Sequence, residues 1–235
     1  MSFAPLLEVR NLNVFYDHFQ AVRDVDLTVG AGEIVSIIGA NGAGKSSFLK
    51  ALVRQAGHST GSATFEGGNL WQYSTRGIVN LGVALVPEGR KLFPSLTVQE
   101  NLSIGWEIGR KGDIALDTVY EWFPVLYERR RQHARDLSGG QQQMVALGRA
   151  LLANPKLLLC DEISLGLAPR VVGELYAIIP VIRDRGVGVI LVEQDIARSL
   201  AVADRFYCFL EGEVSLSGKP GEIDRESIMQ HYFGT

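Results

Sequence analysis

Apolar residues recur along the chain in short runs that favour strands at its beginning and a mixture of helices and strands later. Five early segments have strand character and are bounded by polar, glycine or proline residues: 7–16, 22–29, 33–38, 62–65 and 82–86. The third segment runs into a glycine-rich stretch, after which apolar positions recur at helical spacing over residues 46–53. This order predicts a strand, a glycine loop and a helix.

The middle of the chain, residues 87–155, has a helical pattern. Thr97 is followed three residues later by Glu100, and Ser138 by Gln141. Each pair fits a capping box, in which two side chains satisfy the free backbone groups at a helix start. We therefore interpret this stretch as a helical insertion.

Strand character resumes after the helical stretch. Residues 157–160 and 187–192 are continuous apolar runs on either side of a helical pattern over residues 170–183. Such runs predict a βαβ unit in a parallel sheet that is covered on both faces. After them, residues 206–210 and 213–217 are expected to form a hairpin, and residues from 220 onward a terminal helix.

The 235-residue chain has a globular composition, with 46% hydrophobic and 21% charged residues. Its formal net charge of -3 gives no positive field to gather nucleic-acid phosphates, so a sequence-independent nucleic-acid binder is disfavoured. We find no basic-then-apolar leader and no unbroken apolar run of about 20 residues, and therefore expect a cytosolic protein. Cys160 and Cys208 lie in strand-like runs and are expected to be buried, inert thiols.

The glycine-rich stretch carries the first chemical signal. It fits the phosphate-loop pattern and stands after a predicted strand and before a predicted helix: Gly39, Ala40, Asn41, Gly42, Ala43, Gly44, Lys45 and Ser46. Glycines let backbone N–H groups turn toward the phosphates, Lys45 supplies a charge, and Ser46 offers a hydroxyl to Mg²⁺. A glycine-rich turn without chemistry is the alternative, and this context disfavours it.

Two carboxylates close the apolar run at residues 157–160. In open parallel sheets, ligands collect beyond the carboxyl ends of the strands. We therefore expect Asp161 to reach Mg²⁺ through water and Glu162 to be the catalytic residue that orients or deprotonates the attacking water. Two adjacent acids alone usually mark a solvated strand end, but a phosphate loop on a neighbouring strand favours the functional interpretation.

A second anion-binding surface is predicted far along the chain from the first, at a helix start: Ser138, Gly139, Gly140 and Gln141. The serine caps the helix, and the two glycines permit an anion to approach the N-terminal amides closely. As a bare motif, this stretch could be only a cap, and Ser-Gly-Gly also occurs in many linkers.

Residues 39–46, 137–141 and 157–162, in this order, resemble the phosphate loop, signature and second nucleotide motif of ATP-binding cassette (ABC) ATPases. The resemblance covers essentially the whole chain and implies an α/β fold in one domain, residues 1–235. A P-loop NTPase parallel-sheet core is expected with an antiparallel β subdomain and a helical subdomain. The resemblance implies three parts. Residues 1–86 form the β subdomain and the phosphate-loop part of the core, and residues 87–155 form the helical subdomain with the signature. Residues 156–235 form the rest of the core with the terminal hairpin and helix.

The resemblance also implies that two cassettes sandwich two ATP molecules. The phosphate site of one subunit, extending to Ser47, would face the signature of the other. Tyr16, in a loop ahead of the phosphate strand, is implied to stack on adenine, and a core tyrosine is the alternative.

Five shorter segments are similar to LivF-type subunits of branched-chain amino acid importers: residues 86–90, 92–94, 96–98, 161–169 and 192–194. The corresponding subunits of urea and short-chain amide importers look much the same. The chain would then work at the cytoplasmic face of the inner or plasma membrane. It would pair with a second, different ATPase subunit, a homodimer being the alternative, dock on two permeases and serve an external solute-binding protein. We expect Phe93 to be exposed and to pack against a permease helix; a core phenylalanine is the alternative.

Four positions depart from the general cassette pattern: Glu88 replaces a glutamine, Gln194 the switch histidine, Ala168 an aspartate and Ile163 a proline. Glu88 still offers an oxygen to Mg²⁺. Gln194 can donate a hydrogen bond to the γ-phosphate but cannot titrate as histidine does.

A soluble cassette ATPase acting on nucleic acid or ribosomes is the main rival function, but such proteins typically carry a second cassette or a long coiled-coil insertion. A regulatory module without turnover is disfavoured because Glu162 is present.

Overall fold

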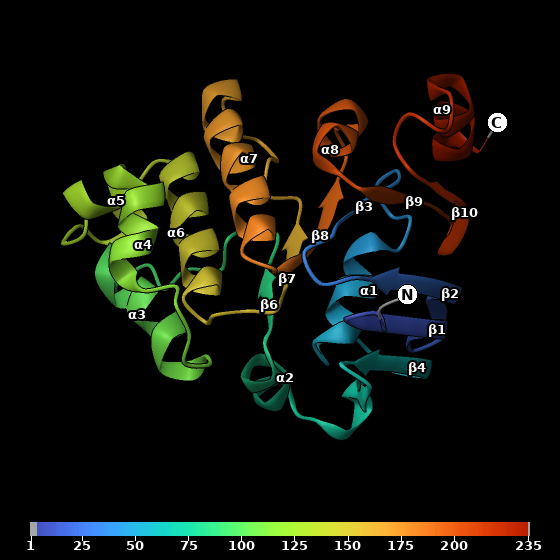
Figure 1. The fold of residues 1–235 in the computed structure, drawn as a ribbon, viewed down its shortest axis with the longest axis horizontal. Coiled ribbons are helices and arrows are strands. Elements are labelled where there is room, and N and C mark those ends of the chain that lie inside the picture. The colour runs from blue at the N-terminus through green and yellow to red at the C-terminus, as the bar shows by residue number, and fades with distance from the viewer. Residues whose placement is uncertain (1–3, 235) are drawn as a thin grey trace.

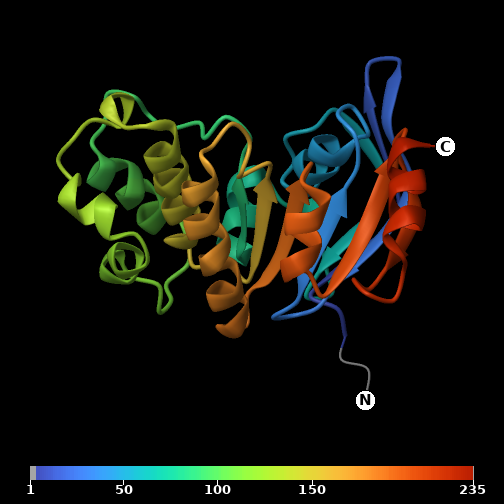
Figure 2. The same cartoon turned by 90° about the horizontal axis from the view of Figure 1, so that it is seen from above.

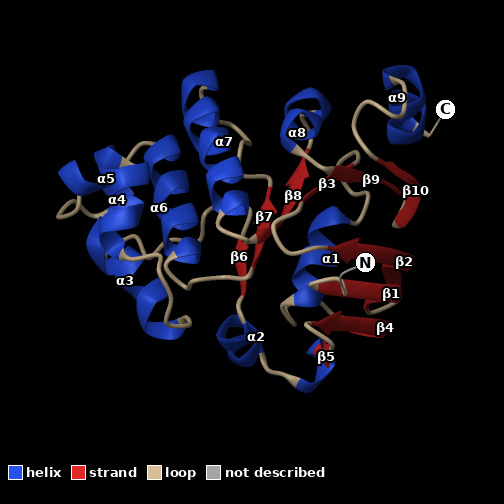
Figure 3. Ribbon diagram, viewed as in Figure 1, coloured by secondary structure: helices blue, strands red, loops and turns tan. Residues whose placement is uncertain are grey.

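The computed structural model describes residues 4–234 and contains two β-sheets with helices packed around them (Figure 1). The larger sheet has six strands in the order β10-β9-β3-β8-β7-β6 (Figure 3). Neighbouring strands from β9 to β6 pair in parallel, and β10 pairs antiparallel with β9. The strand bounds are β3 Ile34–Ile38, β6 Val83–Val86, β7 Leu157–Asp161, β8 Gly188–Glu193, β9 Arg205–Leu210 and β10 Glu213–Gly218.

The smaller sheet is antiparallel, with the order β2-β1-β4-β5. It is built almost entirely from the beginning of the chain, where the alternating pattern is strongest. The bounds are β1 Leu7–Tyr16, β2 Phe19–Val29, β4 His58–Phe65 and β5 Gly68–Asn69, followed by a 3₁₀ turn at Leu70–Gln72.

Strand β3 shows why the large sheet is covered on both faces. Successive side chains of a strand point to opposite faces. Ile34 packs in the cluster that contains α7 (Pro169–Asp184), whereas Val35 packs in the cluster that contains α1 (Lys45–Leu52) and the small sheet. Helix α8 (Ile196–Val202) lies on the same face as α7, with α9 (Arg225–Phe233) near the C-terminus (Figure 2).

The remaining long helices gather beside β6, at the end of the molecule opposite the small sheet (Figures 1 and 2). Both predicted capping boxes are present, at the starts of α3 and α6. The bounds in this part of the chain are α2 Thr75–Leu81, α3 Val98–Ile108, α4 Leu116–Trp122, α5 Pro124–Glu128, a 3₁₀ turn at Ala134–Asp136, and α6 Gly139–Leu151.

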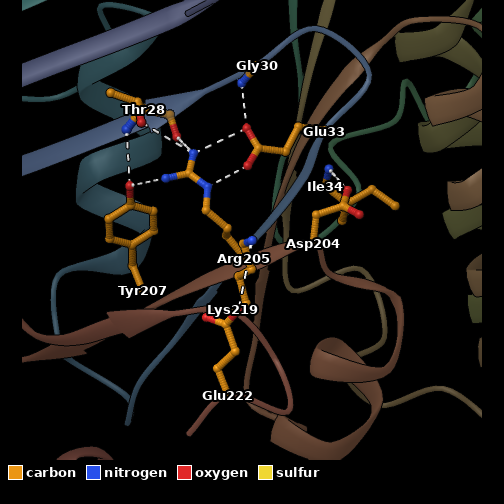
Figure 4. A network of polar contacts seen from close by, with 9 residues as sticks. All are labelled: Thr28, Gly30, Glu33, Ile34, Asp204, Arg205, Tyr207, Lys219 and Glu222. Atoms are coloured by element: carbon orange, nitrogen blue, oxygen red, sulfur yellow. Dashed lines mark hydrogen bonds and ion pairs between the residues drawn. The ribbon is translucent and has the colours of Figure 1, made fainter. Parts of the chain in front are cut away.

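A polar network joins the two sheets where β2 turns into β3 (Figure 4). The guanidinium of Arg205 donates to the Glu33 carboxylate, to the Thr28 carbonyl oxygen at 2.7 Å and to the Tyr207 hydroxyl at 3.1 Å. Glu33 also accepts a 2.6 Å hydrogen bond from the Gly30 N–H. Since Thr28 belongs to β2 and Arg205 to β9, one side chain connects the small sheet to the large one.

The predicted fold class is confirmed, and several predicted elements need correction. The terminal helix begins at Arg225 and not at Pro220, because residues 219–224 form turns and an isolated bridge between Pro220 and Ile223. Helices α2 and α8 were not predicted. Both cysteines are buried as expected, and burial raises the thiol pKa of each. Across residues 4–234, no helix combines the length and apolar character that crossing a bilayer requires.

Candidate functional site

Three loops meet at one edge of the large sheet because the strands before them are parallel and in register. Ile38 of β3 pairs with Glu193 of β8, and Asp161 of β7 pairs with Val192 of β8. The chain therefore leaves these strands at nearly the same height. The glycine-rich loop, the residues after the two carboxylates and the residues after β8 all open on this edge, where ligands of such sheets collect.

A pocket of about 470 Å³ lies at this edge. The phosphate loop lines it from Asn41 to Ser47, and Glu88, Glu162 and Gln194 line it from the ends of three other strands. Three residues that the sequence did not single out complete the lining: Phe19, Ala21 and Leu165.

The glycine at the end of the phosphate loop is required by its surroundings. Gly44 has a φ of 97°, in the left-handed region that favours glycine. A Cβ atom at this position would lie 2.4 Å from the carbonyl oxygen of Ala21. The loop is therefore packed against β2, which fixes the direction in which α1 begins and points its N-terminal amides at the pocket.

Lys45 is held inside the loop and not in solvent. Its ammonium donates to the carbonyl oxygens of Gly39 at 2.7 Å and Ala40 at 3.0 Å, and lies 3.8 Å from a carboxylate oxygen of Glu162. The residue is only 4% exposed, and this burial lowers the pKa of the amine. The backbone thus holds one positive charge at the base of the pocket.

Ser46 and Asp161, predicted to serve Mg²⁺ together, are in contact. The Ser46 hydroxyl donates a 2.8 Å hydrogen bond to Asp161, whose pKa is raised by burial. Ser46 and Glu88 line the pocket, whereas Asp161 is not among its lining residues and contacts Ser46 from outside the lining. Hydroxyl and carboxylate oxygens are the hard ligands that Mg²⁺ prefers, so the donor set fits this ion. Within residues 4–234, no cluster of three His, Cys, Asp or Glu side chains could hold a metal ion.

Glu162 and Gln194 form a hydrogen-bonded pair beside Lys45. The Gln194 amide donates to a carboxylate oxygen of Glu162 at 2.6 Å. Glu162 has a φ of 50°, an uncommon conformation for a residue other than glycine, and its N–H is anchored to the Val192 carbonyl at 3.0 Å. Strained backbone of this kind persists where surrounding contacts impose it and is concentrated at functional sites.

The predicted signature forms a cap, but at a distance from this pocket. Ser138 accepts from the Gln141 N–H at 3.4 Å, and Gln141 accepts from the Ser138 N–H at 3.0 Å. None of these residues, nor the two glycines between them, is among the described residues that line the pocket. The chain therefore presents its two predicted anion-binding surfaces separately.

Comparison with known protein families matches residues 22–164 to the family described as ABC transporter. The chain belongs to this family. Within it, the chain is 44% identical over 211 residues to BraG of Pseudomonas aeruginosa, described as a high-affinity branched-chain amino acid transport ATP-binding protein, with 89% of this chain and 91% of BraG covered. It is 30% identical over 221 residues to LivF of Archaeoglobus fulgidus, described as a probable branched-chain amino acid transport ATP-binding protein, with 93% and 94% covered.

A solved structure of a nucleotide-free ATP-binding cassette from an ABC transporter has the same fold. Its TM-score is 0.84 at 22% identity, covering 99% of this chain and 96% of that chain. The predicted ABC ATPase fold is confirmed by this likeness. As a member of the ABC transporter family, the chain is an ATPase.

Tyr16, implied by the resemblance to stack on adenine, is 37% exposed and lies outside the lining of the phosphate pocket. It pairs with Phe19 across the turn between β1 and β2. Phe19 is 64% exposed and does line the pocket. The sequence signal for Phe19 was a large aromatic residue close to Tyr16. Either ring can therefore stack on the base.

Sequence reasoning also missed Glu193, a carboxylate that is 2% exposed. It accepts hydrogen bonds from the Ser164 N–H at 3.2 Å and from the Ser164 hydroxyl at 2.7 Å, and burial raises its pKa. Glu193 thus ties the loop after Glu162 to the end of β8. An acid closing a continuous apolar strand, directly before Gln194, was the signal that could have revealed it.

Proposed function

We propose that this ABC ATPase powers the uptake of branched-chain amino acids through partner permeases. The observation that carries the proposal is the 44% identity to BraG over 89% of this chain. The site supports it, because a phosphate loop, a carboxylate beside it and an oxygen donor set suited to Mg²⁺ occupy one edge of the sheet.

In the proposed reaction, the backbone amides from Asn41 to Ser47 and the ammonium of Lys45 bind the phosphates of ATP. Glu162 orients the attacking water and accepts its proton. Gln194 holds the Glu162 carboxylate in place through its amide. Ser46, Asp161 and Glu88 would hold Mg²⁺, which neutralises developing charge on the phosphates when bound.

The proposed site is completed by a second cassette. A lone chain keeps Ser138 and its glycines out of its own phosphate pocket, so this helix start is free to face the ATP of a partner. We expect a heterodimer with a different ATPase subunit, as the LivF-type resemblance implies, and a homodimer is the alternative. Tyr16 or Phe19 would stack on the adenine of the ATP bound by this chain.

A second cavity, next to Phe93, supports docking on a permease. It has a volume of about 570 Å³ and lies between α1, α2 and β6 on one side and α3 and α6 on the other. Phe93, predicted to be exposed, is 49% exposed and lines it with Ile108, which is 42% exposed. Exposed apolar residues around a cavity are typical of an interaction site. Docking there would keep the chain peripheral, at the cytoplasmic face of the membrane.

Uptake measurements test the proposed transport function. The chain is deleted from its native cells and returned either unchanged or as Lys45→Ala, and uptake of labelled leucine, valine and urea is followed. Restoration of leucine and valine uptake by the unchanged chain alone supports the proposal. Restoration of urea uptake alone would assign the chain to the urea importers, and no effect on any solute would contradict an importer role.

A further inference from the structure

Arg90 contacts the first turn of the signature helix, although the two are far apart in the sequence. Its guanidinium donates a 3.1 Å hydrogen bond to the Gln142 side chain of α6. The same group covers Gly139, because a Cβ atom at Gly139 would lie 3.0 Å from a guanidinium nitrogen of Arg90. The start of α6 is therefore packed directly against this arginine.

The segment that carries Arg90 is held in an unusual conformation. Gly89, Arg90 and Lys91 have φ values of 72°, 65° and 45°, three successive residues in the left-handed region. For residues other than glycine this conformation is strained and persists only when neighbouring contacts impose it. Arg149 of α6 imposes it here, because its guanidinium donates to the carbonyl oxygens of Arg90 at 3.2 Å and Lys91 at 2.9 Å.

Arg90 also adds a positive charge at the start of α6. Across residues 4–234 it forms no ion pair, and it lies at a helix N-terminus, which carries partial positive charge. An anion brought to this helix start would relieve both charges. In the proposed dimer, that anion is the triphosphate bound by the other cassette.

We propose that Arg90 is a positioning residue that fixes the signature turn for the ATP bound by a second cassette. This rests on the composite site of the proposed function. Arg90 holds Gly139 and, through it, Ser138 in the orientation that faces the partner's nucleotide. Glu88, two residues earlier, lines this chain's own pocket, so the same segment touches both ATP sites of the dimer.

The test separates the two ATP sites in the assembled complex of this chain with its ATPase partner and permeases. Glu162→Gln in this chain leaves turnover only at the site that uses this chain's signature. Removal of the equivalent acid from the partner leaves turnover only at the site that uses this chain's phosphate loop. If the complex contains a homodimer, two differently tagged copies of this chain are used, so that Glu162→Gln is present in only one of them. Arg90→Met is then introduced into each arrangement, and kcat and KM for ATP are measured.

In the first arrangement, we expect Arg90→Met to lower kcat by roughly tenfold, the effect of losing one charge-assisted hydrogen bond. In the second, kcat and KM should stay unchanged. Arg90→Lys keeps a cationic donor for Gln142 and should restore most of the turnover. An equal loss of kcat in both arrangements, including a loss caused by poor folding, would overturn the proposal. An unchanged kcat in the first arrangement would overturn it as well.

Ser138→Ala in the same two arrangements is the control for the composite site itself. If Ser138→Ala lowers kcat in the first arrangement and Arg90→Met does not, the role of Arg90 is wrong and the proposed dimer stands. If Ser138→Ala has no effect in the first arrangement, the composite site is wrong, and the proposal for Arg90 fails with it.

Discussion

At the scale of residues, the groups predicted from the sequence are those whose roles follow from local spacing. The order of strand, glycine loop and Lys45 predicted the phosphate site, and the acid at position 162 was predicted because it follows a buried strand. The contact between Gln194 and Glu162 was not predictable, since it depends on the register of β8 against β7. The burial of Glu193 depends on the same register. The residue roles and the subdomain boundaries stay predictions until they are tested.

Replacement of Lys45 by alanine tests the phosphate loop at this scale. The loop loses the one buried positive charge near the phosphates, so we expect ATP affinity to fall by roughly 100-fold. Binding is measured by isothermal titration with ATP and Mg²⁺. Lys219→Ala, at an exposed position far from the pocket, is the control and should bind as the unchanged chain does. Equal affinities in the two variants would rule out the phosphate-loop assignment.

At the scale of elements, the sequence predicted those helices and strands that have strong end signals or unbroken apolar runs. The starts of α3 and α6 carry capping boxes that were visible in the sequence and are present in the structure. Helices α2 and α8 span seven residues each, too short for a periodic pattern to be distinguished from a loop. Each begins at a side-chain cap, Ser74 before α2 and Asp195 before α8, but a lone cap without a periodic run after it does not distinguish a helix from a turn.

The contact between α6 and α7 supplies a prediction about packing. A Cβ atom at Gly140 would lie 2.7 Å from a methyl group of Val171, whose branched side chain has little freedom to move away. We expect Gly140→Ala to lower the free energy of unfolding by about 1–3 kcal/mol in urea denaturation. Val171→Ala should restore much of the loss.

Gly173 provides the matched control for this prediction. It lies in α7, and a Cβ atom added to it would have no neighbour within 4 Å among the described residues. Gly173→Ala should therefore stabilise the chain by about 0.5–1 kcal/mol through helix propensity. A Gly140→Ala variant as stable as Gly173→Ala would mean that the two helices are not packed as described.

At the scale of the whole molecule, the alternation of strands and helices predicted a covered parallel sheet, and the resemblance to ABC ATPases implied the rest of the fold class. Neither indicated how the two sheets are joined. Arg205 and Glu33 are distant in sequence, and nothing local indicates that they meet. The large cavity beside Phe93 likewise arises only when the helical part packs beside β6. Such features depend on several elements at once.

The Arg205 network supplies a prediction at this scale. Arg205→Met removes hydrogen bonds to Glu33, Thr28 and Tyr207 and leaves the mostly buried Glu33 without its cation. We expect a loss of about 2–3 kcal/mol in the free energy of unfolding, measured in urea. Arg10→Met, which removes an exposed ion pair with Glu8, should leave stability unchanged. Similar stability of both variants would show that the network does not join the sheets energetically.

Association with the permeases is tested through Phe93. Phe93→Ala should leave ATP binding intact, because the residue lies outside the phosphate pocket, and should lower recovery of permeases by roughly tenfold in co-purification from native membranes. Phe233→Ala removes an aromatic of similar exposure at the far end of the chain and serves as control. Loss of folding in Phe93→Ala would favour a packing role, and normal permease recovery would contradict the docking site.

The central claim is that Glu162, held between Lys45 and Gln194, drives ATP hydrolysis at this pocket. The direct test is single-turnover hydrolysis of ATP by the assembled complex, with ATP binding measured in parallel. The partner site is inactivated, and this chain is either unchanged or carries Glu162→Gln. Ser46, Asp161 and Lys45 remain in this variant, so ATP should still bind with similar affinity. Hydrolysis should slow by at least about 100-fold, the contribution of a positioned general base. Hydrolysis at the unchanged rate, or loss of ATP affinity with turnover per bound nucleotide preserved, would contradict the account.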